Sequence, residues 1–164
     1  MLKSFEEMPP HARVWIYQHP GIIDEAILPA VRQAVHMFLE SWTSHNQALW
    51  TAGDVLYQKF VVIMADESKA GASGCALDKA THFITYLNQQ FGLELFDRTQ
   101  VAYYAPGGQT DIKTAGLQEL RQMYGSGKID QNTLVFDNLV ATKEDFENKW
   151  IKELSSSWHK RFAL

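Results

Sequence analysis

Residues 60–79 have the sequence FVVIMADESKAGASGCALDK, and this stretch decides the fold. Its first six residues are apolar and rich in β-branched side chains, which predicts a buried strand over 60–65. From Leu77 onward apolar side chains recur at intervals of three and four residues as far as Phe91, which predicts a helix over 76–91. The residues between them therefore form a loop that leads from a strand into the N-terminus of a helix.

This loop has the composition of an anion-binding turn. Gly71 and Gly74 allow positive φ and a close backbone approach, and Ser73 can cap the helix. Free N–H groups at a helix N-terminus hold anions and lower the pKa of a thiol, and Cys75, the only cysteine, stands at that position. One interpretation is therefore an enzyme with Cys75 as a thiolate nucleophile, or a site for a small anionic or phosphate-bearing ligand.

Polar residues at the end of the predicted strand complete this candidate site. Glu67 or Asp66 is the candidate general acid or base for an enzyme that uses Cys75. The residues predicted to bind the ligand are Asp66, Ser68, Gly71, Ser73 and Gly74. A simpler interpretation is a polar strand end, glycines that turn the chain and a cysteine that fills a small gap. A third hypothesis has Asp66 and Glu67 bind a metal or a nucleotide; all three stay open.

A nucleophilic Cys75 needs a base from elsewhere in the chain. His82 lies two helical turns away, about 10 Å along the axis, which is too far for direct activation. The remaining candidates are His19, at the end of a predicted strand, and His159, near the C-terminus. None of the six histidines stands at a metal-ligand spacing with a nearby cysteine or acidic residue, so no metal site that uses a histidine is predicted.

The first two thirds of the chain alternate strands and helices in a recognisable order. Strands are predicted at 13–18, at 48–57 with a bulge at Gly53-Asp54, and at 99–104; a helix is predicted from an Asp24 cap to about 44–46. The order is strand, helix, strand, strand, helix, strand. This predicts an α+β fold of the ferredoxin-like βαββαβ type, with both helices on one face of an antiparallel sheet.

The last third is predicted to be a C-terminal helix-strand-helix extension. It contains a short helix ended by Gly125, a strand at 133–137, and a helix that opens at a capping box beginning with Thr142 and continues to Leu154. The tail 158–162 is aromatic and basic, and it either packs back on the domain or forms a contact surface. We therefore expect one domain over 1–164, with a core at 12–105 and the extension at 106–164.

Composition narrows the class of protein. The chain has 164 residues, 46% of them apolar, and a net charge of −4 with no basic cluster beyond Lys160-Arg161, which argues against nucleic acid and anionic membranes as partners. No apolar run approaches ~20 residues, so no membrane insertion is expected, and the N-terminus lacks the apolar segment of a signal peptide. A single cysteine is typical of a reducing compartment, which predicts a cytoplasmic location.

Several segments resemble a family of small bacterial proteins that is often labelled "ABC transporter ATPase". These segments are 13–18, 66–68, 71–75, 78–79, 82–83, Phe96-Asp97-Arg98, Ser157-Trp158-His159 and 161–162. The label implies ATP hydrolysis, which requires a phosphate-binding loop. The only Gly-Lys pair, Gly127-Lys128, has Gln122 where that loop needs its first glycine and Ile129 where it needs Ser or Thr, so ATPase activity is not expected.

The sequence alone therefore predicts a small protein without a complete catalytic constellation. The favoured hypothesis is a non-catalytic binding or interaction module, and the alternative is an enzyme or anion binder that uses the Gly71–Cys75 loop. Sheets of the predicted type associate through open edges and faces, so a homodimer is the hypothesis for a protein partner.

Overall fold

A computed structural model of the chain describes residues 1–68 and 74–164. It is an α+β structure, as the sequence predicts. The helices are α1 (Leu28–Ser41), α2 (Gly74–Phe91), α3 (Leu117–Gly125), α4 (Lys143–Lys149) and α5 (Lys160–Ala163), with a 3-10 turn at Leu154–Ser156. The strands are β1 (Arg13–Gln18), β2 (Thr43–Ser44), β3 (Gln47–Ala48), β4 (Trp50–Leu56), β5 (Phe60–Asp66), β6 (Gln100–Tyr104), β7 (Ile112–Gly116), β8 (Leu134–Phe136) and β9 (Ile151–Glu153).

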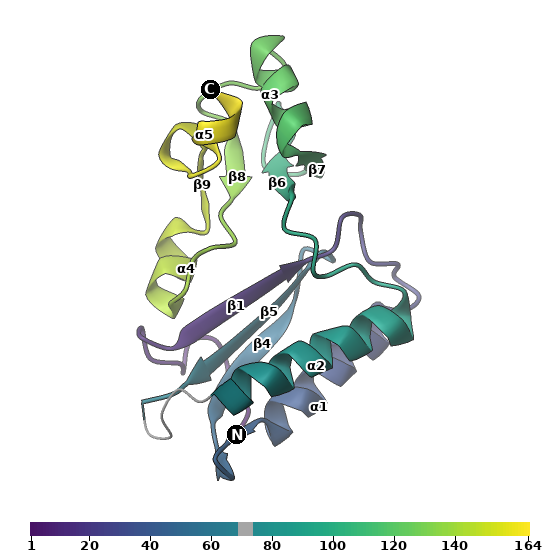
Figure 1. Cartoon of the computed structure of the whole chain (residues 1–164), viewed down its shortest axis with the longest axis vertical. Helices are drawn as coiled ribbons and strands as arrows, with labels where there is room; N and C mark the ends of the chain where they lie inside the picture. Colours follow the sequence, from purple (N-terminus) through teal and green to yellow (C-terminus); the bar gives the residue numbers. More distant parts are fainter. Residues whose placement is uncertain (69–73) are drawn as a thin grey trace.

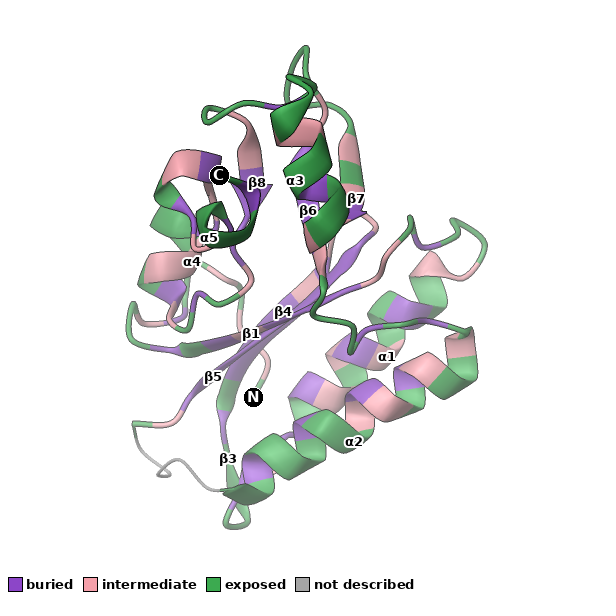
Figure 2. Ribbon diagram, turned by 45° about the horizontal axis from the view of Figure 1, so that its top comes forward, coloured by how far each residue is buried: buried purple, intermediate pink, exposed green. Residues whose placement is uncertain are grey.

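The central sheet has the order β1-β5-β4, and both pairs of strands are antiparallel. Every residue of β5 is buried, because this strand lies in the middle and both of its faces are covered (Figure 2). In β1, Arg13 pairs with Ala65 at one end of the sheet and Gln18 pairs with Phe60 at the other. The two ends of β1 therefore present different groups of side chains.

Helices α1 and α2 lie side by side on one face of this sheet, as predicted (Figure 1). Val61, Ile63 and Ala65 of β5 point into the same apolar cluster as the buried residues of both helices. Gly53 of β4 is required by this packing, because a Cβ there would lie 2.5 Å from the carbonyl oxygen of Val62 and 2.8 Å from a methyl carbon of Leu39. The predicted bulge is wrong, since the β4–β5 register runs unbroken through Gly53.

The opposite face of the central sheet is covered by the C-terminal third of the chain. Phe60, Val62 and Met64 of β5 share a cluster with Phe136 and Trp150. The second sheet has the order β7-β6-β8-β9, and α3 and α5 pack together beside it around a further small cluster. Residues 106–164 are therefore more than an appended extension, because they supply half of the cover that the central strand needs.

The fourth strand differs from the ferredoxin-like prediction. The order β1-β5-β4 agrees with the first three strands of that fold, but β6 leaves the central sheet and pairs with β7 and β8 (Figure 1). The place beside β1 is taken instead by a later segment, in which Thr142 pairs with Arg13 and the carbonyl oxygen of Ala141 accepts from the N–H of Val14. Strand β6 is apolar on both faces. Ala102 and Tyr104 pack into the cluster with Phe136 and Trp150, and Val101 and Tyr103 pack into the small cluster with α3 and α5, so both faces are covered in the second sheet.

Two predicted helix ends are also corrected, and one strand was not predicted. Helix α1 ends at Ser41, because His45 and Asn46 adopt positive φ in the tight turn of the β2–β3 hairpin. The last predicted helix begins at the Thr142 cap, whose Oγ1 accepts from the N–H of Asp145 at 3.2 Å, but it ends at Lys149 and continues as β9. Strand β7 has no counterpart in the prediction. Within the described residues, no helix is both long and apolar enough to cross a membrane.

Candidate functional site

The end of the central sheet that carries Asp66 is called the loop end here. Asp66 is buried, and its Oδ1 accepts from the backbone N–H of Ser68 at 3.0 Å and lies 3.2 Å from Nε2 of His11. Burial raises the pKa of Asp66, but the hydrogen bonds from Ser68 and His11 outweigh it and leave the pKa below its ordinary value. The Asp66 carboxylate is thus already engaged in closing the turn after β5.

Glu67, the predicted acid or base, is also engaged at the loop end. Its carboxylate lies 3.5 Å from the guanidinium of Arg13, which in turn lies over the ring of Trp15 with 4.8 Å to the centroid. Among the described residues, no group of three His, Cys, Asp or Glu side chains could hold a metal ion. The acidic pair therefore has internal partners, and these contacts favour the simpler interpretation of this end.

The nucleophile predicted from the sequence, Cys75, lies at the start of α2. Gly74 and Cys75 are exposed in the first turn of the helix, while Gly71 and Ser73 lie outside the described residues. His19 is at the opposite end of the helix: its Nδ1 accepts from the N–H of Glu94, beyond the last residue of α2, about 25 Å away at 1.5 Å per residue.

His159 is not beside Cys75 either. It lies in the C-terminal tail, which packs against the second sheet and does not cover the loop end. Neither histidine that the sequence offered as a base therefore serves Cys75.

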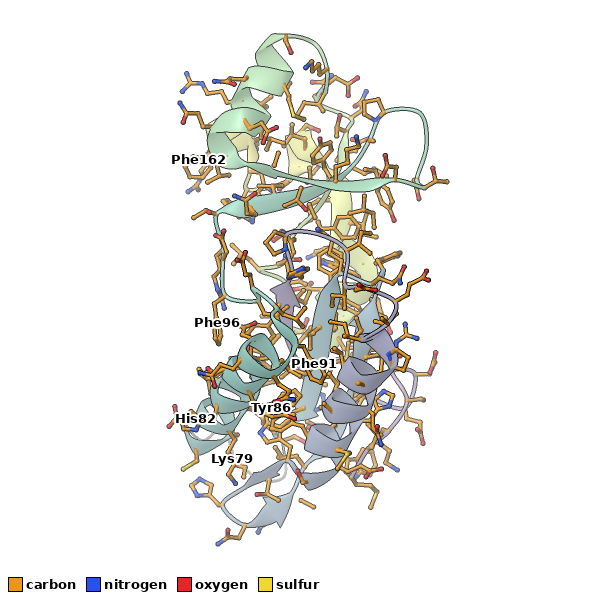
Figure 3. All side chains as sticks on the ribbon, turned by 90° about the vertical axis from the view of Figure 1, so that its right-hand side faces the viewer. Lys79, His82, Tyr86, Phe91, Phe96 and Phe162 are labelled. Carbon is orange, nitrogen blue, oxygen red and sulfur yellow. The ribbon has the colours of Figure 1, made fainter. Side chains whose placement is uncertain are left out.

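A cavity lies at the other end of the central sheet, where the two sheets meet. The seven residues of β5 separate it from the loop end by about 20 Å, since a strand rises by about 3.3 Å per residue. Its volume is about 50 Å³ and it is partly enclosed. We call it the junction cavity; its polar and rim residues are Gln18, Arg98, Asn138, Leu139, Trp158 and His159. Phe96 lies close in sequence to Arg98, and Phe162 lies close in sequence to His159. Both lie on the same side of the molecule in Figure 3, Phe96 below the junction and Phe162 above it.

A chain of amide hydrogen bonds fixes one wall of the junction cavity. Asn138 donates from Nδ2 to Oε1 of Gln18 at 2.9 Å, and its Oδ1 accepts from Nε1 of Trp150 at 2.9 Å. Gln18 in turn donates from Nε2 to the carbonyl oxygen of Gln100 at 3.2 Å. Three segments far apart in the sequence are held together by these bonds, which makes the wall rigid.

His159 forms the second wall and is 3% exposed. Its Nδ1 is hydrogen-bonded to Oγ of Ser157, which is also buried and accepts from the backbone N–H of His159 at 3.1 Å. Burial is the main cause that lowers the pKa of His159 to about 4; the Asp137 carboxylate acts in the opposite direction and the Lys152 ammonium in the same one. The imidazole is therefore neutral at pH 7.

Trp158 lies against His159, with 4.0 Å between the ring centroids. Its indole Nε1 is buried, and it has no hydrogen-bond acceptor within the described part of the chain. A buried N–H without an acceptor costs about 1–3 kcal/mol, so this group is an exception that calls for an explanation.

Two charged side chains stand at the exposed rim of the junction cavity. Arg98 forms no salt bridge with any residue that the structure describes. Asp97 accepts at Oδ1 from the N–H of Thr99 at 2.8 Å and from its hydroxyl at 2.6 Å, and these bonds lower the pKa of Asp97. The carboxylate is thus engaged by its own turn, whereas the guanidinium is available.

Sequence reasoning placed no function at the junction cavity. The nearest signals were Phe96-Asp97-Arg98 and Ser157-Trp158-His159, two of the stretches that carry the resemblance to the bacterial family, and the fold brings them to one cavity. Comparisons of the chain with protein-family models, with curated proteins and with solved structures found no match. The residues around the junction cavity are therefore the basis for a functional proposal.

Proposed function

We propose that this chain is a non-catalytic binding protein that holds a small ligand in the junction cavity. The observation that carries the proposal is the pair of polar side chains with unused hydrogen-bonding capacity in a partly enclosed cavity. Trp158 has a buried N–H without an acceptor, and His159 has a hydrogen bond at Nδ1 but none at Nε2 among the described residues. Ligand sites combine concave, largely apolar walls with a few such polar groups.

The size of the junction cavity supports a small ligand. A volume of about 50 Å³ holds about three to five water-sized groups if each needs about 10–15 Å³. Ile16, Leu95 and Phe136 provide apolar lining beside the polar groups. Such a cavity fits one functional group with a short apolar remainder, and larger ligands would extend past the exposed rim at Leu139.

The chemistry of the lining supports binding over catalysis. With a pKa of about 4, caused mainly by burial, His159 is a weak base at neutral pH. The amide groups of Gln18 and Asn138 are occupied by each other and by their neighbours. At the loop end, the contacts of Asp66 and Glu67 likewise give no support to the alternative enzyme at Cys75.

The ATPase activity implied by the family resemblance has no support in the local structure. Residues 125–128 end α3 instead of opening a helix: the N–H of Ser126 bonds to the carbonyl oxygen of Gln122, and Gly127 has a φ of 77°. A phosphate-binding loop needs a helix N-terminus at this position. The family relationship, the cytoplasmic location and a homodimer, for which the edge strand β7 is the candidate surface, stay predictions.

The proposal is tested by blocking the rim of the junction cavity. Leu139 is exposed there, so Leu139→Trp narrows the opening without disturbing the core; Leu77→Trp, at an exposed position of α2, is the matched control. We expect some members of a panel of short acids, amides and alcohols to raise the melting temperature of the wild type and of Leu77→Trp, but not of Leu139→Trp. A ligand at 100 times its Kd stabilises by about 2.7 kcal/mol. A panel without effect, or an equal response of all three proteins, would contradict the proposal.

A further inference from the structure

Each acceptor atom on the amide wall of the junction cavity already accepts one internal hydrogen bond. Oε1 of Gln18 accepts from Asn138, and Oδ1 of Asn138 accepts from Trp150. Each oxygen keeps a second lone pair, so a ligand that donates would share an engaged oxygen without displacing its internal bond. The choice between a donor and an acceptor ligand therefore depends on the groups that have no recorded partner.

The unused groups inside the cavity are donors. The Ser157 hydroxyl is buried, and Nδ1 of His159 is the one acceptor recorded for it among the described residues, so we assign the hydroxyl as the donor and Nδ1 as the acceptor. Since the low pKa of His159 keeps the ring neutral, its single proton is then on Nε2. Nε2 of His159 and Nε1 of Trp158, on two rings in contact, are thus N–H groups with no acceptor among the described residues.

Charge at the rim agrees with these donors. Arg98 offers a guanidinium with no salt bridge, and Asp97 on the same turn keeps its Oδ1 bonded to Thr99. An ammonium group could reach Asp97 at the rim, but it would meet N–H groups farther in. An anionic oxygen is matched by the guanidinium at the rim and by the two N–H groups, whereas only the second oxygen of Asp97 opposes it, so most of the unengaged groups favour an anion.

From this arrangement we propose that the ligand of the junction cavity is a short-chain organic acid, whose carboxylate accepts from Nε1 of Trp158 and Nε2 of His159 and is balanced by Arg98. This proposal rests on the small-ligand function proposed above. A planar carboxylate with one or two further carbons matches a volume of about 50 Å³ with apolar lining. A tetrahedral phosphate has four oxygens to satisfy, and among the described residues Trp158 and His159 are the interior side chains that offer it an N–H with no recorded acceptor.

The test follows the indole N–H signal of Trp158 in ¹⁵N-labelled protein at neutral pH and constant ionic strength; its absence in Trp158→Phe assigns it. The protein is titrated with propionate, with the isosteric but uncharged propionamide, and with inorganic phosphate. We expect propionate to shift the signal saturably and propionamide to bind at least about tenfold more weakly, as a charge-assisted hydrogen bond is roughly twice as strong as a neutral one.

The role of Arg98 is tested with a matched pair of substitutions. Arg98→Gln is expected to weaken propionate binding about tenfold, the equivalent of about 1.4 kcal/mol, whereas Arg98→Lys keeps part of the affinity. Arg161→Gln makes the same charge change at an exposed position outside the cavity lining, and it should leave the affinity unchanged.

The outcomes separate the two proposals. If propionamide binds as tightly as propionate, the small-ligand function stands and the carboxylate proposal is overturned. The carboxylate proposal is also overturned if phosphate shifts the Trp158 signal and propionate does not, or if Arg161→Gln weakens binding as much as Arg98→Gln. A signal that no compound of any class moves overturns both.

Discussion

The two ends of the central sheet both carry polar side chains, but these side chains are engaged differently. At the loop end, Asp66 is bonded to Ser68 and His11, and Glu67 is paired with Arg13. At the junction cavity, Trp158 and His159 keep N–H or nitrogen positions with no partner among the described residues. The residue types, two carboxylates and a cysteine, favoured the loop end as the binding site. The hydrogen-bonding groups that have no partner favour the junction cavity instead.

The difference shows what decides whether a polar cluster binds a ligand. A carboxylate that already accepts several hydrogen bonds stabilises its own turn and gains little from a ligand. A buried donor without an acceptor costs free energy until something supplies one. A change of pH or a substitution at the junction cavity should therefore affect stability or binding differently from the same kind of change at the loop end or at a matched residue.

The largest expected effect is a pH dependence of stability that comes from His159. Burial lowers its folded pKa to about 4 from an ordinary value of 6.5, so the unfolded chain takes up the proton first as the pH falls. Stability should therefore decrease by about 3 kcal/mol between pH 6.5 and pH 4 and then level off. The measurement is the free energy of urea unfolding at half-unit pH intervals.

The loop end supplies the contrast for this titration. The pKa of Asp66 lies below 3.8, so its stabilising contribution is present above that pH and is lost only at lower pH. His159→Asn should flatten the curve between pH 6.5 and 4, and His82→Asn, at an exposed position of α2, should not. If the Asn variant does not fold, direct NMR titration of the His159 ring decides; a pKa near 6.5 would contradict the account.

A smaller difference is expected between two tryptophans. Trp150→Phe removes an N–H that donates to Asn138 and leaves the Oδ1 of Asn138 without it, whereas Trp158→Phe removes an N–H that has no acceptor. We expect Trp150→Phe to lose about 2 kcal/mol more free energy of unfolding than Trp158→Phe, within the 1–3 kcal/mol cost of an unsatisfied buried group. Equal losses in urea unfolding would mean that the Trp158 N–H is satisfied.

The smallest effect is expected at Cys75. Its thiol is exposed in the first turn of α2, so Cys75→Ser should change the free energy of unfolding by less than about 0.5 kcal/mol. Ligand affinity at the junction cavity should also be unchanged, and an alkylating reagent should label the wild-type thiol in the folded protein. A loss of ligand binding in Cys75→Ser would return the function to the loop end.

Much of the secondary structure could be predicted from the sequence because local periodicity and caps determine it. The strand β5, the helix α2 and the Thr142 cap all follow from patterns within a few residues. The partner of β6 could not be predicted in this way, because its apolar residues on both faces fit either sheet. Only the tertiary packing decides that residues 141–142, and not β6, lie beside β1.

The site could be predicted only in part, for a related reason. Sequence shows that Asp66, Glu67 and Cys75 are chemically capable groups, but it does not show that Arg13 and His11 already engage the two carboxylates. It likewise shows an aromatic tail, but not that the tail meets the segment around Arg98 about sixty residues earlier. Whether a polar group has a partner depends on long-range contacts, which local patterns do not encode.

The most direct test of the central claim is a map of amide chemical shifts in the ¹⁵N-labelled protein with and without saturating propionate. The account predicts that the largest changes fall at the junction end, on Gln18, Arg98, Asn138 and the Trp158–His159 segment, while Ser68 and Cys75 stay unchanged. Changes concentrated on Ser68 and Cys75, with a silent junction cavity, would show that the loop end is the binding site and would contradict the account.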